Sequence, residues 1–61
     1  LGLVQYYRDV ANSYVRKGDP DAAQKAYNQF RLLANQTDIA IENYISNLRK
    51  NRSQPPMTNS Q

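Results

Sequence analysis

The sequence predicts an all-α fold: two antiparallel helices joined by a tight turn, a third helix packed against them, and a disordered C-terminal tail. Two observations carry this prediction. Apolar residues recur at three- and four-residue intervals in three segments, as they do along one face of an α-helix. Between the first two segments, Gly18-Asp19-Pro20 joins a residue that ends helices to two that begin them.

The first helix is expected over residues 3–17. Arg16 and Lys17 fall in its last turn, where cations suit the negative end of the helix dipole. Gly18 can then take the left-handed conformation that ends many helices. The apolar stripe of this helix consists of Leu3, Val4, Tyr7, Val10, Ala11, Tyr14 and Val15.

The second helix is expected over residues 20–34, with Asp19 as its N-cap and Pro20 in its first position. Two helices joined by so few residues must fold back antiparallel. Small side chains then let the two backbones approach closely, and they are Ala11, Ala22 and Ala23. The apolar face of the second helix consists of Ala23, Ala26, Tyr27, Phe30, Leu33 and Ala34.

The third helix is expected over residues 38–50, capped by Thr37 or Asp38. Its apolar seam consists of Ile41, Tyr44, Ile45 and Leu48, and its polar back of Glu42, Asn43, Ser46, Asn47 and Arg49. Residues 51–61 are polar and contain a proline pair, so they are predicted to form a disordered tail. Residues 1–50 would then form one small helical unit.

The sequence lacks the residues that several classes of function require. The chain has neither cysteine nor histidine, which removes disulfides, the usual zinc sites and two common nucleophiles. It has no glycine-rich phosphate loop, and its five acidic residues read as helix-start or solvated residues. We therefore expect no enzyme activity, no cofactor and no metal. We also expect no membrane span, because no apolar run approaches about 18 residues. The expected location is the cytoplasm.

The net charge of +3 comes mostly from Arg49, Lys50 and Arg52. The first 48 residues carry five charges of each sign, unlike a nucleic-acid-binding domain with a basic stripe on its folded face. We interpret the three cations as complementing the dipole of the third helix and aiding solubility. The alternatives are weak binding to nucleic acid or anionic lipid, and a phosphorylation site at Ser53.

The first two predicted helices resemble a tetratricopeptide repeat, a helix–turn–helix unit of about 34 residues. The resemblance covers residues 4–37 and rests on Tyr7 at the family's Trp position, Val10-Ala11 at its Leu-Gly pair, Tyr14 at its Tyr, Gly18-Asp19 at its turn, Ala23 at its small residue and Tyr27 at its aromatic. The sequence departs from the family in having Tyr7 for Trp, Phe30 for a small residue and Asn35 for the closing Pro. A bulky ring at Phe30 should widen the packing against the next helix. The alternatives are a microtubule-interacting-and-trafficking type three-helix domain and an unrelated helical hairpin or bundle.

The resemblance implies a protein-interaction module, such as a scaffold or adaptor, and a recognition strip on the polar face of the first helix. Arg8 and Asn12 match positions at which chaperone-binding members of the family hold a partner's terminal carboxylate. Val15 and Arg16 would extend this strip, and Tyr6 would be an exposed contact. The expected partner is a protein or peptide with an acidic or C-terminal carboxylate group. The simpler interpretation of the strip is a solvated helix face.

The resemblance also implies that the unit is not self-sufficient, since such repeats stack on neighbours. The third helix would cap an array or begin a further repeat, so we expect a fragment or the C-terminal end of an array. A preceding repeat, a second copy or a partner would cover the exposed edges, which we expect at Leu3, Val4, Ile41, Ile45 and Leu48. The competing function is a structural element of a larger oligomer with no peptide ligand. Coverage of the third-helix seam by the first two helices would favour the interaction module.

Overall fold

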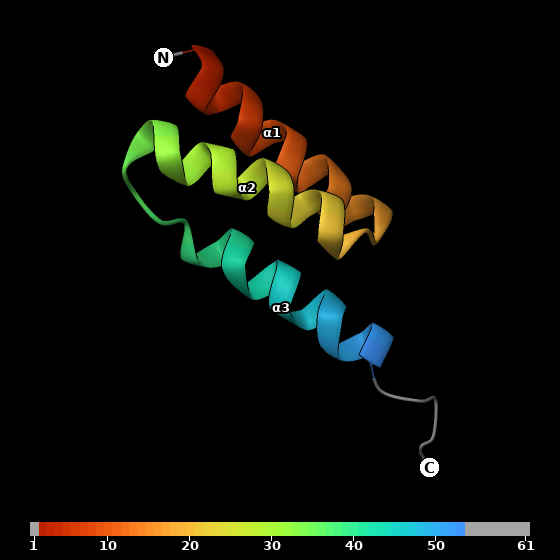
Figure 1. Cartoon of the computed structure of the whole chain (residues 1–61). Helices are drawn as coiled ribbons and strands as arrows, with labels where there is room; N and C mark the ends of the chain where they lie inside the picture. The colour runs from red at the N-terminus through yellow and green to blue at the C-terminus, as the bar shows by residue number, and fades with distance from the viewer. Residues whose placement is uncertain (1, 54–61) are drawn as a thin grey trace.

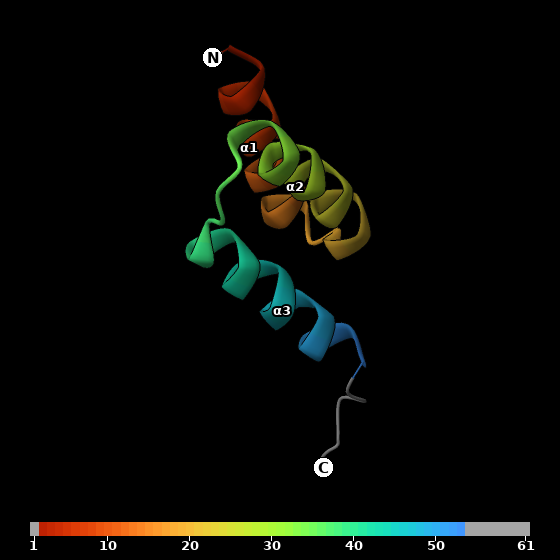
Figure 2. The ribbon, with the colours of Figure 1, turned by 60° about the vertical axis from the view of Figure 1, so that its left-hand side comes forward.

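The described part of the chain consists of three helices, which confirms the all-α prediction (Figure 1). The structure is a computed structural model that describes residues 2–53, with side chains described for residues 2–51. The helices are α1 (Gly2–Lys17), α2 (Pro20–Ala34) and α3 (Ile39–Ser53). Helices α1 and α2 form an antiparallel hairpin, and α3 then runs back in the direction of α1 (Figures 1 and 2). Helix α3 contacts both helices of the hairpin, but α1 and α2 pack together far more extensively.

The observed helix boundaries agree closely with the predicted ones except at the end of α3. Helix α3 continues through residues 51–53, three residues beyond its predicted end at Lys50. These three residues are polar but include no helix breaker, and the first proline beyond α3 is Pro55. The remainder of the predicted tail, residues 54–61, lies outside the described residues.

The turn between α1 and α2 is fixed by backbone hydrogen bonds that require a left-handed residue. Gly18 has φ of +78°, its N–H donates to the Val15 carbonyl at 3.0 Å, and the Asp19 N–H donates to the Tyr14 carbonyl at 3.0 Å. This pair of bonds is the Schellman motif, which satisfies carbonyls at a helix end. Asp19 then caps α2, because its Oδ1 accepts from the Ala22 N–H at 3.1 Å.

We expect Gly18→Ala to lower the free energy of unfolding by about 1–2 kcal/mol, the cost of a left-handed conformation for a residue with a Cβ atom. No heavy atom lies within 4 Å of a Cβ built at Gly18, so the effect should come from the backbone alone. Urea unfolding followed by circular dichroism measures it. The matched control is Gly2→Ala, a helical site with equally open surroundings that should not lose stability. Equal stabilities of the two variants would contradict the role given to Gly18.

The joint between α2 and α3 is built differently from the first turn. Asn35 ends α2 in a left-handed conformation with φ of +55°, and its N–H donates to the Arg31 carbonyl at 2.8 Å. Of the two predicted caps for α3, the structure uses Asp38, whose Oδ1 accepts from the Ile41 N–H at 3.3 Å. The joint therefore contains one left-handed asparagine and one N-cap, with neither glycine nor proline.

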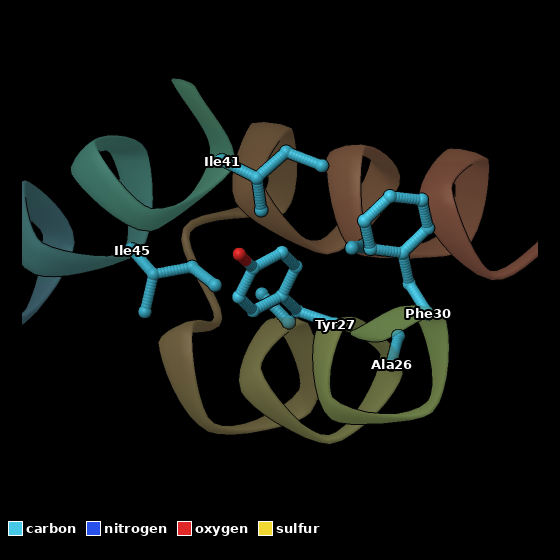
Figure 3. Packing of buried hydrophobic residues seen from close by; sticks show 7 residues of the cluster. Ala26, Tyr27, Phe30, Ile41 and Ile45 are labelled. Atoms are coloured by element: carbon cyan, nitrogen blue, oxygen red, sulfur yellow. The ribbon is translucent and has the colours of Figure 1, made fainter. Parts of the chain in front are cut away.

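The core draws on all three helices (Figure 3). Ala11 and Ala23 have no exposed surface, in keeping with a close crossing of α1 and α2. The Phe30 ring stacks on Tyr27 with 5.8 Å between ring centroids and is only 4% exposed. Leu33 and Tyr44 were assigned to apolar faces but are 46% and 49% exposed, because they lie at the margins of their stripes. The buried residues are Ala11, Ala23, Ala26, Tyr27, Phe30, Ile41 and Ile45.

Candidate functional site

A cluster of polar side chains joins the three helices where α3 begins. The Tyr27 hydroxyl donates to Glu42 Oε2 at 2.7 Å and accepts from the Asp38 N–H at 2.9 Å. Arg8 Nε lies 3.4 Å from Asp38 Oδ2 and forms an ion pair with it. We call Arg8, Tyr27, Asp38 and Glu42 the Tyr27 cluster. It binds the start of α3 to the hairpin through side chains of both α1 and α2.

Sequence reasoning missed the Tyr27 cluster, because Glu42 was assigned to a solvated helix face and Tyr27 to the apolar stripe. The signal that could have found it is tyrosine, rather than phenylalanine, at a buried position. A buried hydroxyl usually has a hydrogen-bond partner. Tyr27 is only 1% exposed, and its hydroxyl has two such partners, Glu42 and the Asp38 N–H.

The pKa of Tyr27 is raised above its ordinary value of 10.0. Burial is the main cause, since it disfavours the charged phenolate, and the hydrogen bond to Glu42 acts in the same direction. The charge of Glu42 raises the pKa further, whereas the Asp38 N–H and the charge of Arg31 oppose the shift. The cluster therefore holds Tyr27 as the neutral hydrogen-bond donor.

This shift predicts a loss of stability in alkali. Above pH 10 the unfolded chain releases the Tyr27 proton while the folded chain keeps it, so the free energy of unfolding falls as pH rises. The stability that protonated Tyr27 contributes is complete below the pKa of Tyr27 in the unfolded chain. It is lost as pH rises through the pKa of Tyr27 in the folded chain. Urea midpoints between neutral pH and alkali, compared with those of Tyr27→Phe, isolate it from other titrating groups. Parallel profiles for the two proteins would contradict the assignment.

The predicted recognition strip on α1 is only partly available. Arg8 is already paired with a carboxylate of its own chain, although its side chain is 49% exposed. Val15 packs against the core, and Asn12 is half-buried. Arg16 is exposed and donates to the Ser13 hydroxyl at 3.4 Å. The four residues therefore do not form one open row of contacts.

Tyr6 lies apart from this strip and is 57% exposed, whereas its role as a contact stays a prediction. Its ring meets that of Tyr7 edge to face, with 5.1 Å between centroids. This contact orients the Tyr6 ring while leaving more than half of it accessible. Tyr6 is therefore the most accessible aromatic residue on α1.

The predicted interface edges differ in how far they are open. Leu3 is 59% exposed, whereas Val4 is half-buried against the core. In α3, Ile41 and Ile45 are only 1% and 3% exposed, and Figure 3 shows both of them next to the Tyr27 ring. Leu48 is half-buried. Ile41 and Ile45 are thus core residues rather than an open edge, because the seam of α3 packs on the hairpin.

Five exposed apolar residues lie in the segments where α1 begins, α2 ends and α3 begins, and Figure 1 shows these segments at the same end of the molecule. We call this region the apolar end, and it consists of Leu3, Tyr6, Leu32, Leu33 and Ile39. A shallow, open hollow lies at the same end. Its lining residues are Asn28, Arg31, Leu32, Asn35, Gln36 and Thr37.

No family model, curated protein or solved structure matches this chain. The tetratricopeptide resemblance therefore stays a prediction. Within residues 2–53, no helix is both long and apolar enough to cross a membrane. In the same residues, no three acidic groups lie together as a metal site would require.

Proposed function

We propose that the chain is a non-catalytic protein–protein interaction module whose partner packs on helix α1 and the apolar end. The observation that carries the proposal is the exposure of Leu3 and Tyr6, which are 59% and 57% accessible on one helix. Leu33, on the adjoining end of α2, is 46% exposed and adds to the same region. Patches of exposed apolar side chains commonly mark contact sites, and tyrosine is enriched among the residues that dominate binding energy.

The partner in this proposal is a protein segment that presents apolar side chains to Leu3 and Tyr6. A carboxylate of the partner would have to compete with Asp38 for Arg8, which makes Arg8 a secondary contact. Asn12 and Arg16 can supply polar contacts beside the apolar ones. The tetratricopeptide resemblance agrees with such a role, but it is an analogy at the level of fold.

A structural element of a larger oligomer is the competing proposal. Such an element would need a second chain to cover the α3 seam. Ile41 and Ile45 are already covered by the chain's own helices, which supports the interaction module. The cytoplasmic location and the scaffold or adaptor role belong to the same proposal.

A displayed library of random peptides, selected on the full chain, tests the function. We expect selected peptides to lose most of their affinity for a Leu3→Asp, Tyr6→Asp double variant that melts like the wild type. The matched control is Asn43→Asp, Asn47→Asp, which adds the same charge to the exposed back of α3 and should bind normally. The affinity of the same peptides for an Asn12→Ala variant shows whether the polar strip of α1 contributes to binding. Peptides that bind the wild type and the double variant of α1 equally would overturn the proposal.

A further inference from the structure

The sequence opposes a continuous helix much more strongly at the joint between α1 and α2 than at the joint between α2 and α3. The first has a left-handed glycine, an aspartate N-cap and a proline in the first helical position, all of which oppose a continuous helix. The second has a left-handed asparagine and the cap at Asp38, but neither glycine nor proline. From residue 21 to residue 53 the sequence contains neither glycine nor proline. Nothing in the covalent chain therefore prevents α2 and α3 from forming one helix.

The closed form of the second joint depends on one unfavourable backbone conformation. Asn35 has φ of +55°, and left-handed backbone is disfavoured for residues with a Cβ atom, although asparagine tolerates it better than most. The following residues, Gln36 and Thr37, are exposed. If Asn35 took right-handed helical angles and residues 36–38 followed, α2 would continue directly into α3.

The contacts that hold α3 are all made to the hairpin. Ile41 and Ile45 enter the core, and Tyr27 donates to Glu42. Toward the other end of α3, Arg49 Nη1 lies 3.0 Å from Asp21 Oδ1 of α2. The hairpin of a second copy offers the same surface, so α3 can make these contacts in either place.

We propose that α3 exchanges between two copies of the chain, with the second joint straightening so that α2 and α3 form one helix. Because α3 runs opposite to α2 in the closed chain, a two-fold axis near the joint would place two such helices antiparallel. Each α3 then packs on the α2 of the other copy. A helix from Pro20 to Ser53 is about 50 Å long at 1.5 Å per residue.

The balance between the two forms is decided mainly at the joint, since the packing contacts are the same in both. Straightening relieves the left-handed Asn35 and adds helical hydrogen bonds across residues 35–38. It gives up the Asp38 cap and the bond from the Asp38 N–H to the Tyr27 hydroxyl. The exchanged dimer uses the α3 surface of the hairpin and does not involve Leu3 and Tyr6 of α1, but it moves Ile39 of the apolar end together with α3.

Two substitutions at Asn35 test the proposal in the full chain. Alanine favours the right-handed helix, and glycine favours the left-handed conformation of the closed joint. We expect dimerisation, measured by sedimentation equilibrium over a concentration series, to be roughly tenfold or more stronger for Asn35→Ala than for Asn35→Gly. Each dimer contains two α2–α3 joints, so the conformational preference of residue 35 contributes twice to the free energy of dimerisation. Equal dimerisation of the two variants would overturn the proposal.

A charge reversal distinguishes exchange from ordinary association. In the Asn35→Ala background, Asp21→Arg gives one variant with two cations at this pair, and Arg49→Asp gives another with two carboxylates. The Arg49 and Asp21 side chains are 45% and 75% exposed, so folding should tolerate either change. When the variants are mixed and incubated, only exchange of α3 pairs opposite charges at both sites. Native mass spectrometry should show heterodimers above the share for random pairing, and a random or lower share would sink the proposal.

Discussion

The Phe30→Ala variant should be largely unfolded, or close to it, under conditions in which the wild type is folded. Removing a buried phenylalanine side chain costs about 3–5 kcal/mol. A chain with roughly fifty ordered residues has a total stability of only about 3–8 kcal/mol. Phe30 is 4% exposed and stacks on Tyr27, so its removal also takes away the stacking partner of the Tyr27 ring.

This result separates the structure from the family resemblance. A tetratricopeptide repeat has a small residue at the position of Phe30, so the resemblance alone suggests that alanine is tolerated there. The matched control is Leu32→Ala in the same helix, where the side chain is 76% exposed and the expected change is within about 0.5 kcal/mol. Thermal and urea unfolding followed by circular dichroism compare the three proteins. If Phe30→Ala and Leu32→Ala melt alike, the core described above is incorrect.

The Tyr27→Phe variant is expected to lose about 1–3 kcal/mol although it keeps the ring. The missing hydroxyl leaves the Glu42 carboxylate and the Asp38 N–H without their partner in a partly buried place. The start of α3 should loosen first, because both partners lie in its first turn or at its cap. Tyr44→Phe is the control, since Tyr44 is 49% exposed on α3.

A double-mutant cycle assigns this loss to the proposed bond. If Tyr27 and Glu42 interact as described, Tyr27→Phe should cost less in a Glu42→Ala background than in the wild type. The comparison uses urea unfolding at a pH below 9, where Tyr27 is protonated in both folded and unfolded chains. Additive effects of the two substitutions would show that the hydroxyl does not bond to Glu42.

Helix positions were largely predictable because the signals that set them are local. Gly18 and Asp19 act within one turn of where they stand, and both boundaries at this joint agree with the structure. The end of α3 was harder to place, because polar composition at residues 51–53 indicated a tail. Helix continuation there depends on the absence of a breaker rather than on any positive signal.

The candidate site was much less predictable because its contacts join residues far apart in the chain. Tyr27 and Glu42 are 15 positions apart, and no periodic pattern marks that pairing. Arg8 was expected to bind a partner's carboxylate, and the structure places Asp38 of the same chain at that position. Arg8 therefore pairs with a carboxylate of its own chain, and this pairing depends on how α3 packs, which no local pattern in the sequence reveals. The exposure of Tyr6 was predictable, because a residue that falls outside the apolar stripe of a helix is expected to face solvent.

The unequal packing of the three helices has a consequence for the order in which the chain opens. The hairpin has a close crossing at Ala11 and Ala23, whereas α3 is held by a pair of isoleucines and a few polar bonds. Regions with fewer buried contacts open at lower free energy than the rest of a protein. Amide hydrogens of α3 should then exchange with solvent through partial openings in which the hairpin stays folded. During each such opening, Tyr27 and Phe30 are bared to water, and the hairpin surface is available until α3 returns.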